Sequence, residues 1–174
     1  MYLSKISIDR NRTITQIELE KVANDLLMIS VNNNIGDQSA MFSYWRILGS
    51  GGNPPLEIGI NTNTKSIKSI TFFVDTDCFA EFHLLCDSYT EGNIVFNTGI
   101  FCKKNDYIDT FGNYTVSLND DKLLCIFNEQ INIKETIVND SIEYFVNNND
   151  ELQGFALNHL GEQEIDAIKS VYKG

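Results

Sequence analysis

The chain has 174 residues, and its two prolines stand together, so we expect one domain over residues 1–174. It carries 24 acidic and 13 basic residues, a net charge of −11, which argues against binding to nucleic acid or to an anionic membrane. No stretch reaches the length of a membrane span and no signal peptide opens the chain. We therefore expect a cytoplasmic protein whose cysteines are reduced.

The N-terminal part is predicted to contain one strand and one helix. Residues 2–9 have the pattern of a short strand. Thr15 and Glu18 have the spacing of a capping box, in which a hydroxyl and a carboxylate satisfy amides at a helix start. Apolar side chains follow at helical spacing as far as Met28. These features predict an N-terminal helix from Thr15 to Met28.

The centre of the chain is predicted to form a β-hairpin. Residues 41–48 are rich in aromatic side chains and indicate a strand that precedes it. Residues 56–60 alternate between apolar and other side chains, which is typical of a strand with one buried face. Residues 61–65 favour a turn, and residues 67–74 are again apolar and β-branched.

The second half is predicted to add further strands. Residues 93–102 and 141–146 each indicate a strand, and residues 114–118 and 123–127 flank a polar turn, as in a second hairpin. Residues 79–86 fit either a strand or a short helix, and both alternatives stay open.

A C-terminal helix is predicted after Gly161. Ile165, Ile168 and Val171 recur at helical spacing, with acidic residues before them and Lys169 near the end, the order that the helix dipole favours. Two helices thus bracket a run of strands. The expected fold class is α+β, an antiparallel-dominated β-sheet with an N-terminal and a C-terminal helix packed against it.

Catalytic signatures are weak in this sequence. Cys78, His83 and Cys86 could supply zinc ligands, but they lack the paired spacing of a structural zinc site. His159 could pair with a distant cysteine as a nucleophile, although no flanking signature accompanies it. We therefore expect no catalytic residue, no cofactor and no bound metal.

The central hairpin also carries a resemblance. Its pattern I-G-I-x-x-x-T-x-x-I-x-x-I-x-F is formed by Ile58, Gly59, Ile60, Thr64, Ile67, Ile70 and Phe72. These residues resemble the sheet core of small bacterial immunity proteins, which are encoded beside polymorphic or contact-dependent growth-inhibition toxins. The resemblance covers about twenty residues. It implies that the chain binds a cognate toxin domain, often a basic nuclease, and neutralises it by covering or distorting its active site.

The partner-binding residues are expected in the C-terminal third, because residues 135–168 contain eight acidic side chains and no Lys or Arg. Acidic side chains there would steer the chain onto a basic cleft, with one tyrosine as an aromatic anchor. The candidates are Glu143, Tyr144, Asp150, Glu151, Glu162, Glu164 and Asp166. For each acid the alternative is an ordinary solvated face.

Two other functions are compatible with the same sequence. One is a small enzyme or ligand-binding domain that uses a pocket of the sheet. The other is an inhibitor from a mobile element whose acidic surface mimics DNA. The sequence leaves the oligomeric state open.

Overall fold

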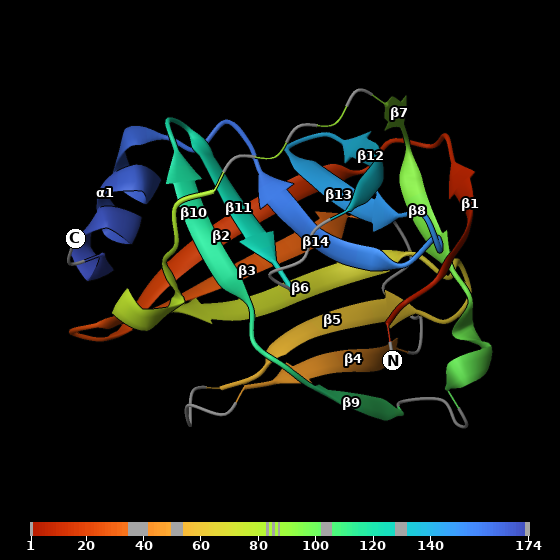
Figure 1. The fold of residues 1–174 in the computed structure, drawn as a ribbon, viewed down its shortest axis with the longest axis horizontal. Coiled ribbons are helices and arrows are strands. Elements are labelled where there is room, and N and C mark those ends of the chain that lie inside the picture. The colour runs from red at the N-terminus through yellow and green to blue at the C-terminus, as the bar shows by residue number, and fades with distance from the viewer. Residues whose placement is uncertain are drawn as a thin grey trace.

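The computed structural model describes residues 2–34, 42–49, 54–82, 84, 86, 88–101, 106–127 and 132–172. These residues form two six-stranded sheets, one two-stranded sheet and a single α-helix (Figure 1). The two large sheets lie face to face as the layers of a β-sandwich, and the helix lies at one end of it.

The first large sheet is built mainly from the N-terminal half of the chain. Its strands lie in the order β2 (Ile14–Ala23), β3 (Leu26–Asn34), β6 (Ile67–Val74), β5 (Leu56–Asn61), β4 (Phe42–Leu48) and β9 (Tyr107–Phe111). Neighbouring strands are antiparallel except β4 and β9, which are parallel.

The second large sheet is built from the C-terminal half. Its order is β10 (Thr115–Asn119), β11 (Lys122–Ile126), β14 (Leu152–Leu157), β13 (Ile142–Asn147), β12 (Ile133–Asn139) and β7 (Tyr89–Glu91). It is antiparallel except between β12 and β7. A third, two-stranded sheet pairs β1 (Lys5–Asp9) with β8 (Asn93–Phe96).

The core lies between the two large sheets. Phe72 on β6 meets Phe155 on β14 with ring centroids 5.3 Å apart, and Trp45 on β4 meets Phe127 at 5.5 Å. Along β4 of the first sheet buried side chains alternate with partly exposed ones, whereas all six residues of β14 in the second sheet are buried, because that sheet is covered on both faces there. This inner layer holds the molecule together.

The predicted N-terminal helix is wrong, because residues 14–34 form the β2–β3 hairpin. The side chains of Thr15, Ile17 and Leu19 are half-buried while their neighbours are exposed, which is the period of a strand and not of a helix. The Thr15 hydroxyl donates to Asn33 Oδ1 at 3.1 Å on the neighbouring strand instead of capping a helix.

The α+β class predicted from the sequence is therefore wrong as well. The chain is mostly β, each large sheet is mixed because it contains one parallel pair of strands, and the described residues contain one α-helix, at the C-terminus. That helix, α1 (Glu162–Val171), confirms the C-terminal prediction: Ile168 and Val171 are buried in the core and acids occupy its first turn.

No helix among the described ranges combines the length and the apolar character needed to cross a membrane.

The predicted hairpins are confirmed. β5 and β6 pair antiparallel around the turn at residues 62–65, and β10 and β11 pair around Asp120 and Asp121. The strands predicted at residues 2–9, 41–48 and 141–146 correspond to β1, β4 and β13.

Two stretches differ from their predictions. The strand predicted over residues 93–102 ends at Phe96, because the Asn97 side chain accepts from Gly99 N at 3.0 Å and starts the short 3-10 helix η2 (Thr98–Ile100). The described residues among 79–86 form neither a helix nor a strand. Phe79 pairs with Val116 of β10 through a single β-bridge. Phe82 and Leu84 pack against a small apolar cluster of the second sheet, formed by Leu124, Phe145 and Ala156.

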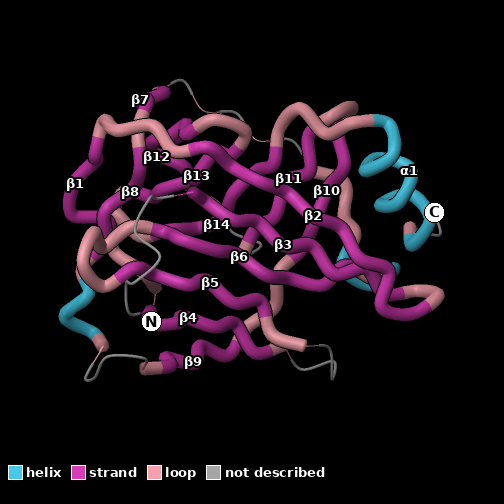
Figure 2. Tube along the Cα trace, turned by 180° about the vertical axis from the view of Figure 1, so that it is seen from behind, coloured by secondary structure: helices cyan, strands magenta, loops and turns pink. Residues whose placement is uncertain are grey.

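The sandwich has two differently closed ends, which Figures 1 and 2 show from opposite sides. At one end α1 packs over the core, and at the other the β1–β8 pair bridges the two large sheets. In that bridge Leu152 N donates to Leu3 O at 2.9 Å, and Phe96 N donates to Lys65 O at 2.8 Å. We call them the α1 end and the β1–β8 end.

Candidate partner-binding surface

Four segments that are distant in the sequence meet at the α1 end. They are the β2–β3 turn, the 3-10 helix η1 (Thr76–Cys78), the β10–β11 turn and α1 itself (Figure 1). The Thr76 hydroxyl donates to Val171 O at 2.9 Å, and Leu160 N donates to Asp121 O at 3.0 Å. The β3–β6 register pairs Leu27 with Val74, which places the β2–β3 turn beside η1.

Acidic side chains are strongly in excess on these segments, which span residues 20–25, 75–81, 119–122 and 162–172. The ten acids are Glu20, Asp25, Asp75, Asp77, Glu81, Asp120, Asp121, Glu162, Glu164 and Asp166, and the three bases are Lys21, Lys122 and Lys169. Such an excess of one sign produces a negative potential over this end of the molecule.

The helix α1 holds part of this charge in a fixed position. Ile168 and Val171 face the core, so Glu162 and Asp166 are left on the exposed side. Glu164 is used structurally, because its carboxylate accepts from the backbone N–H of Gly161 and caps the helix. Acids in the first turn also interact favourably with the helix dipole.

A hollow of about 330 Å³ opens at the same end, between α1, β10 and the start of residues 79–88. The rings of Phe79 and Tyr172 lie in contact at its wall, with centroids 4.5 Å apart. Ala80 N donates to Val116 O at 2.9 Å and fixes the segment that carries Phe79. The hollow is lined by Phe79, Ala80, Glu81, Ser117, Leu118, Asn119, Lys169 and Tyr172.

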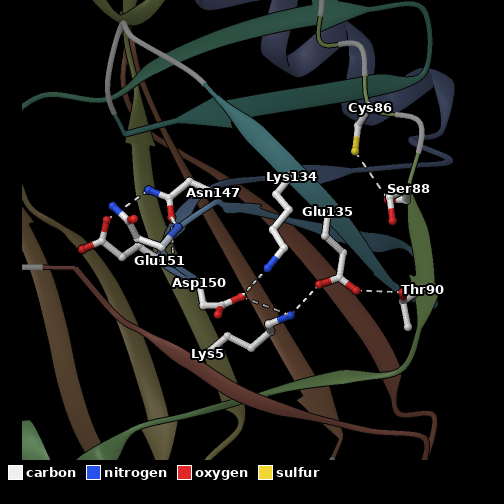
Figure 3. A network of polar contacts seen from close by, with 10 residues as sticks. Lys5, Cys86, Ser88, Thr90, Lys134, Glu135, Asn147, Asp150 and Glu151 are labelled. Atoms are coloured by element: carbon white, nitrogen blue, oxygen red, sulfur yellow. Dashed lines mark hydrogen bonds and ion pairs between the residues drawn. The ribbon is translucent and has the colours of Figure 1, made fainter.

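The β1–β8 end carries a different kind of polar surface, in which opposite charges are paired (Figure 3). Lys5 Nζ lies 2.5 Å from a Glu135 oxygen and 3.6 Å from Asp150, and Lys134 Nζ lies 3.3 Å from the same Asp150 oxygen. The Thr90 hydroxyl donates to Glu135 at 2.8 Å. This network connects β1, β7, β12 and the β13–β14 turn.

The pKa of Glu135 is shifted in the direction that this pairing favours. Burial acts to raise the pKa, but the hydrogen bonds from Lys5 and Thr90 and the charges of Lys5 and Lys134 outweigh it, so the net pKa is lowered. The pKa of Asp150 is lowered as well, first by its hydrogen bond from Lys134. These carboxylates therefore stabilise the fold by pairing with neighbouring lysines.

Formal charges at the β1–β8 end are nearly balanced. Over residues 5–12, 65–68, 88–96, 133–135 and 147–151 the acids are Asp9, Glu91, Glu135, Asp150 and Glu151, and the bases are Lys5, Arg10, Arg12, Lys65, Lys68 and Lys134. Arg12 and Glu91 form a further ion pair. The net negative charge of the chain is thus concentrated away from this end.

The residues predicted from the sequence to bind a partner do not form one surface. Glu162, Glu164 and Asp166 lie together on α1, whereas Asp150 and Glu151 lie at the β1–β8 end. Asp150 is paired with lysines there, and Glu151 accepts from Asn147 Nδ2 at 3.0 Å.

The other two candidates make contacts within the fold. Tyr144 is 1% exposed between the sheets, and its hydroxyl accepts from Asn33 Nδ2 at 3.0 Å, so its ring is not on the surface as an anchor would have to be. Burial raises the pKa of this hydroxyl above its ordinary value. Glu143 has only 14% of its side chain exposed and accepts from Lys122 at 2.9 Å and from Asn158 Nδ2 at 3.0 Å.

Sequence reasoning missed seven of the ten acids at the α1 end: Glu20, Asp25, Asp75, Asp77, Glu81, Asp120 and Asp121. They lie in or beside turns that an antiparallel strand order brings to one end. The two-residue turn at Asn24 and Asp25 is a hairpin signal that would have revealed part of this arrangement.

The thiols and histidines within the described ranges show no arrangement that supports a nucleophile. Burial raises the pKa of the Cys78 thiol to about 12, and it raises the pKa of the fully buried Cys125 thiol as well, so both are protonated near neutral pH. His159 is exposed, with its ring 3.8 Å from the Asp121 carboxylate. His83 and Cys102 lie outside the described residues. In the described part of the chain no three His, Cys, Asp or Glu side chains gather closely enough to hold a metal ion.

Comparison with known proteins does not point to a function. No family model matches this chain, and no curated protein sequence matches it significantly.

Proposed function

We propose that this protein is a non-enzymatic binding protein of the cytoplasm that captures a basic protein domain on its α1 end. In this proposal the partner is a cognate toxin domain, as for the immunity proteins that the central hairpin resembles. The observation that carries the proposal is the excess of ten acids over three bases on the four segments that meet there.

The fold supports such a role in two ways. The α1 end is held by buried side chains of α1 and by backbone hydrogen bonds between its segments, so the backbone that carries the acids is fixed before a partner binds. The hollow beside α1 adds an apolar wall to the charged rim, and interfaces combine these two features at their energetically dominant sites.

Electrostatic capture has a defined kinetic signature. A surface of one sign accelerates association with an oppositely charged partner, and salt weakens the effect because it screens charges beyond about 10 Å at 0.1 M. The acids would occupy the positions that substrate phosphates take in a nuclease cleft, so capture and inhibition would be one event.

The first experiment identifies the partner. The C-terminal domain of the product encoded immediately upstream is expressed with and without this chain, and growth and co-purification are measured. The proposal expects growth arrest that this chain relieves through a salt-sensitive complex. A harmless neighbour that forms no complex would contradict the toxin assignment.

The second experiment locates the surface by comparing two variants that each remove three negative charges. The test variant Glu20→Gln, Glu162→Gln, Asp166→Asn lies at the α1 end, and the control Glu91→Gln, Asp150→Asn, Glu151→Gln lies at the β1–β8 end. At low salt the test variant should associate about five-fold more slowly with the partner and the control at nearly the original rate. Equal rates for both variants would remove the α1 end from the interface.

A further inference from the structure

We infer that the hollow beside α1 receives an arginine side chain of the partner. This inference rests on the proposed function and deepens it, because it names the group that the acidic end recognises. Its elements are the aromatic wall of Phe79 and Tyr172, the carboxylate of Glu81 and the surrounding negative charge.

The aromatic wall is accessible and firmly held. Tyr172 is 43% exposed and its ring rests on Phe79, so one ring supports the other. Phe79 is fixed by the backbone bonds on either side of it, from Phe79 N to Thr76 O at 3.5 Å and from Ala80 N to Val116 O at 2.9 Å. A planar cation that enters the hollow therefore meets a preformed aromatic surface.

The charge on the segments around the hollow identifies the sign of the occupant. Glu81 is exposed at the rim, and Asp77, Asp120 and Asp121 lie on the segments around it. Within the lining Lys169 balances Glu81. The acids on the surrounding segments leave a net negative charge around the hollow, which favours a cation over an anion.

Arginine fits this lining better than lysine does. A guanidinium is planar, stacks on aromatic faces and can bond one carboxylate through two parallel N–H groups, whereas an ammonium is a compact, strongly hydrated charge. The polar groups of Asn119 and Ser117 are already engaged, because Ser117 donates to Asn119 Oδ1 at 3.2 Å and Asn119 donates to Phe82 O at 3.3 Å. Glu81 and the aromatic rings remain as the recognising groups.

The test uses oligo-arginine and oligo-lysine peptides of equal length, with affinities measured by calorimetry at low salt. Both peptides should bind, and oligo-arginine should bind about five-fold more tightly, because stacking of a cation on an exposed ring contributes about 1 kcal/mol. Binding of neither peptide would contradict the proposed function itself. Equal binding of both would overturn only the arginine inference.

Matched variants show whether the preference arises in the hollow. Tyr172→Leu keeps apolar contact with Phe79 and should reduce the preference for arginine, while Tyr107→Leu, at a comparably exposed tyrosine on β9, should leave it intact. An arginine preference that Tyr172→Leu leaves unchanged would overturn the inference. Thermal unfolding of both variants verifies that they are folded.

A second pair separates specific pairing from the general field. Glu81→Gln should weaken both peptides and lower the arginine-to-lysine ratio of affinities, because it removes a bidentate partner. Asp77→Asn, on η1 outside the lining, should weaken both peptides without changing the ratio. Equal effects of the two changes on the ratio would also overturn the inference.

Discussion

The two ends of this sandwich treat charge in opposite ways. At the β1–β8 end Lys5, Lys134, Glu135 and Asp150 neutralise one another across three elements, and the pairing fixes β1 to the second sheet. At the α1 end ten acids face three bases. Paired charges attract one another within the fold, whereas an excess of one sign adds self-repulsion, and in the proposed function the partner supplies the opposite charge.

Most of the acids predicted to bind a partner are divided between the two ends. The acids of the C-terminal third are predicted from the sequence to form one binding surface. Asp150 and Glu151 lie instead at the β1–β8 end. The candidate acids at the α1 end are Glu162, Glu164 and Asp166. Proximity in sequence therefore predicted the location of only three of the six candidate acids correctly. The strand order places the other three elsewhere in the molecule.

The largest predicted effect comes from a variant that weakens the packing of α1 on the core. Ile168 is fully buried on α1, so Ile168→Ala should lower the free energy of unfolding by about 2–5 kcal/mol through lost burial and a residual cavity. Ile6→Ala, at a side chain that is 56% exposed on β1, is the control and should cost less than about 0.5 kcal/mol. Urea titration measures both, and equal losses would show that α1 is not packed as described.

The next largest effect is a loss of stability from a variant at the β1–β8 end. Lys5→Met removes the partner of Glu135, and both side chains are only 13% and 14% exposed, so a poorly solvated carboxylate is left behind. We expect a loss of about 1–3 kcal/mol in urea titration. The double variant Lys5→Met, Glu135→Leu should recover part of it, and a double variant as unstable as the single one would show that charge pairing is not the cause.

A smaller effect tests the internal position of Tyr144. Tyr144→Phe removes the hydroxyl that accepts from Asn33 Nδ2, while Asn33 keeps its bond to Ile67 O at 3.1 Å. Stability should fall by about 1 kcal/mol, and the affinity for the basic partner should not change. A clear loss of affinity with unchanged stability would restore Tyr144 as a partner contact.

The smallest effect is a dependence on pH. Because the pKa of Glu135 is lower in the folded chain than its ordinary value of 4.5, its contribution to stability is present above pH 4.5 and is lost as the pH falls through the folded pKa. The difference in melting temperature between the wild-type chain and Glu135→Gln should therefore shrink between pH 6 and pH 3. A difference that grows on acidification would contradict the direction of the shift.

The parts of the fold that were predictable are those specified locally. The β5–β6 and β10–β11 hairpins follow from alternating strands around short polar turns, and α1 follows from Ile165, Ile168 and Val171 with acids in the first turn. In each case the nearest neighbours in sequence are also the neighbours in space.

The β2–β3 hairpin shows where local reasoning failed. Thr15 and Glu18 satisfy a capping-box pattern, but the same stretch alternates with period two, and pairing with the buried Leu27, Ile29 and Val31 of β3 decides in favour of a strand. Tertiary pairing outweighed a weak local signal.

The candidate surface was predictable only through α1. Its other acids reach the α1 end because β3 pairs with β6 and because the β10–β11 turn bonds to Leu160, and neither contact is encoded by spacing in the sequence. The aromatic wall of the hollow likewise joins Tyr172 to Phe79, about ninety residues earlier in the chain.

Chemical-shift mapping tests the central claim most directly, because it reports on both ends of the same molecule in one titration. The isotope-labelled protein is titrated with an oligo-arginine peptide at low salt, and the backbone amide signals are followed. The largest changes are predicted in α1 and in the β2–β3 and β10–β11 turns, with little change in β1, β8 and the β13–β14 turn. Changes concentrated at the β1–β8 end, or spread evenly over the molecule, would contradict the assignment of the α1 end as the binding surface.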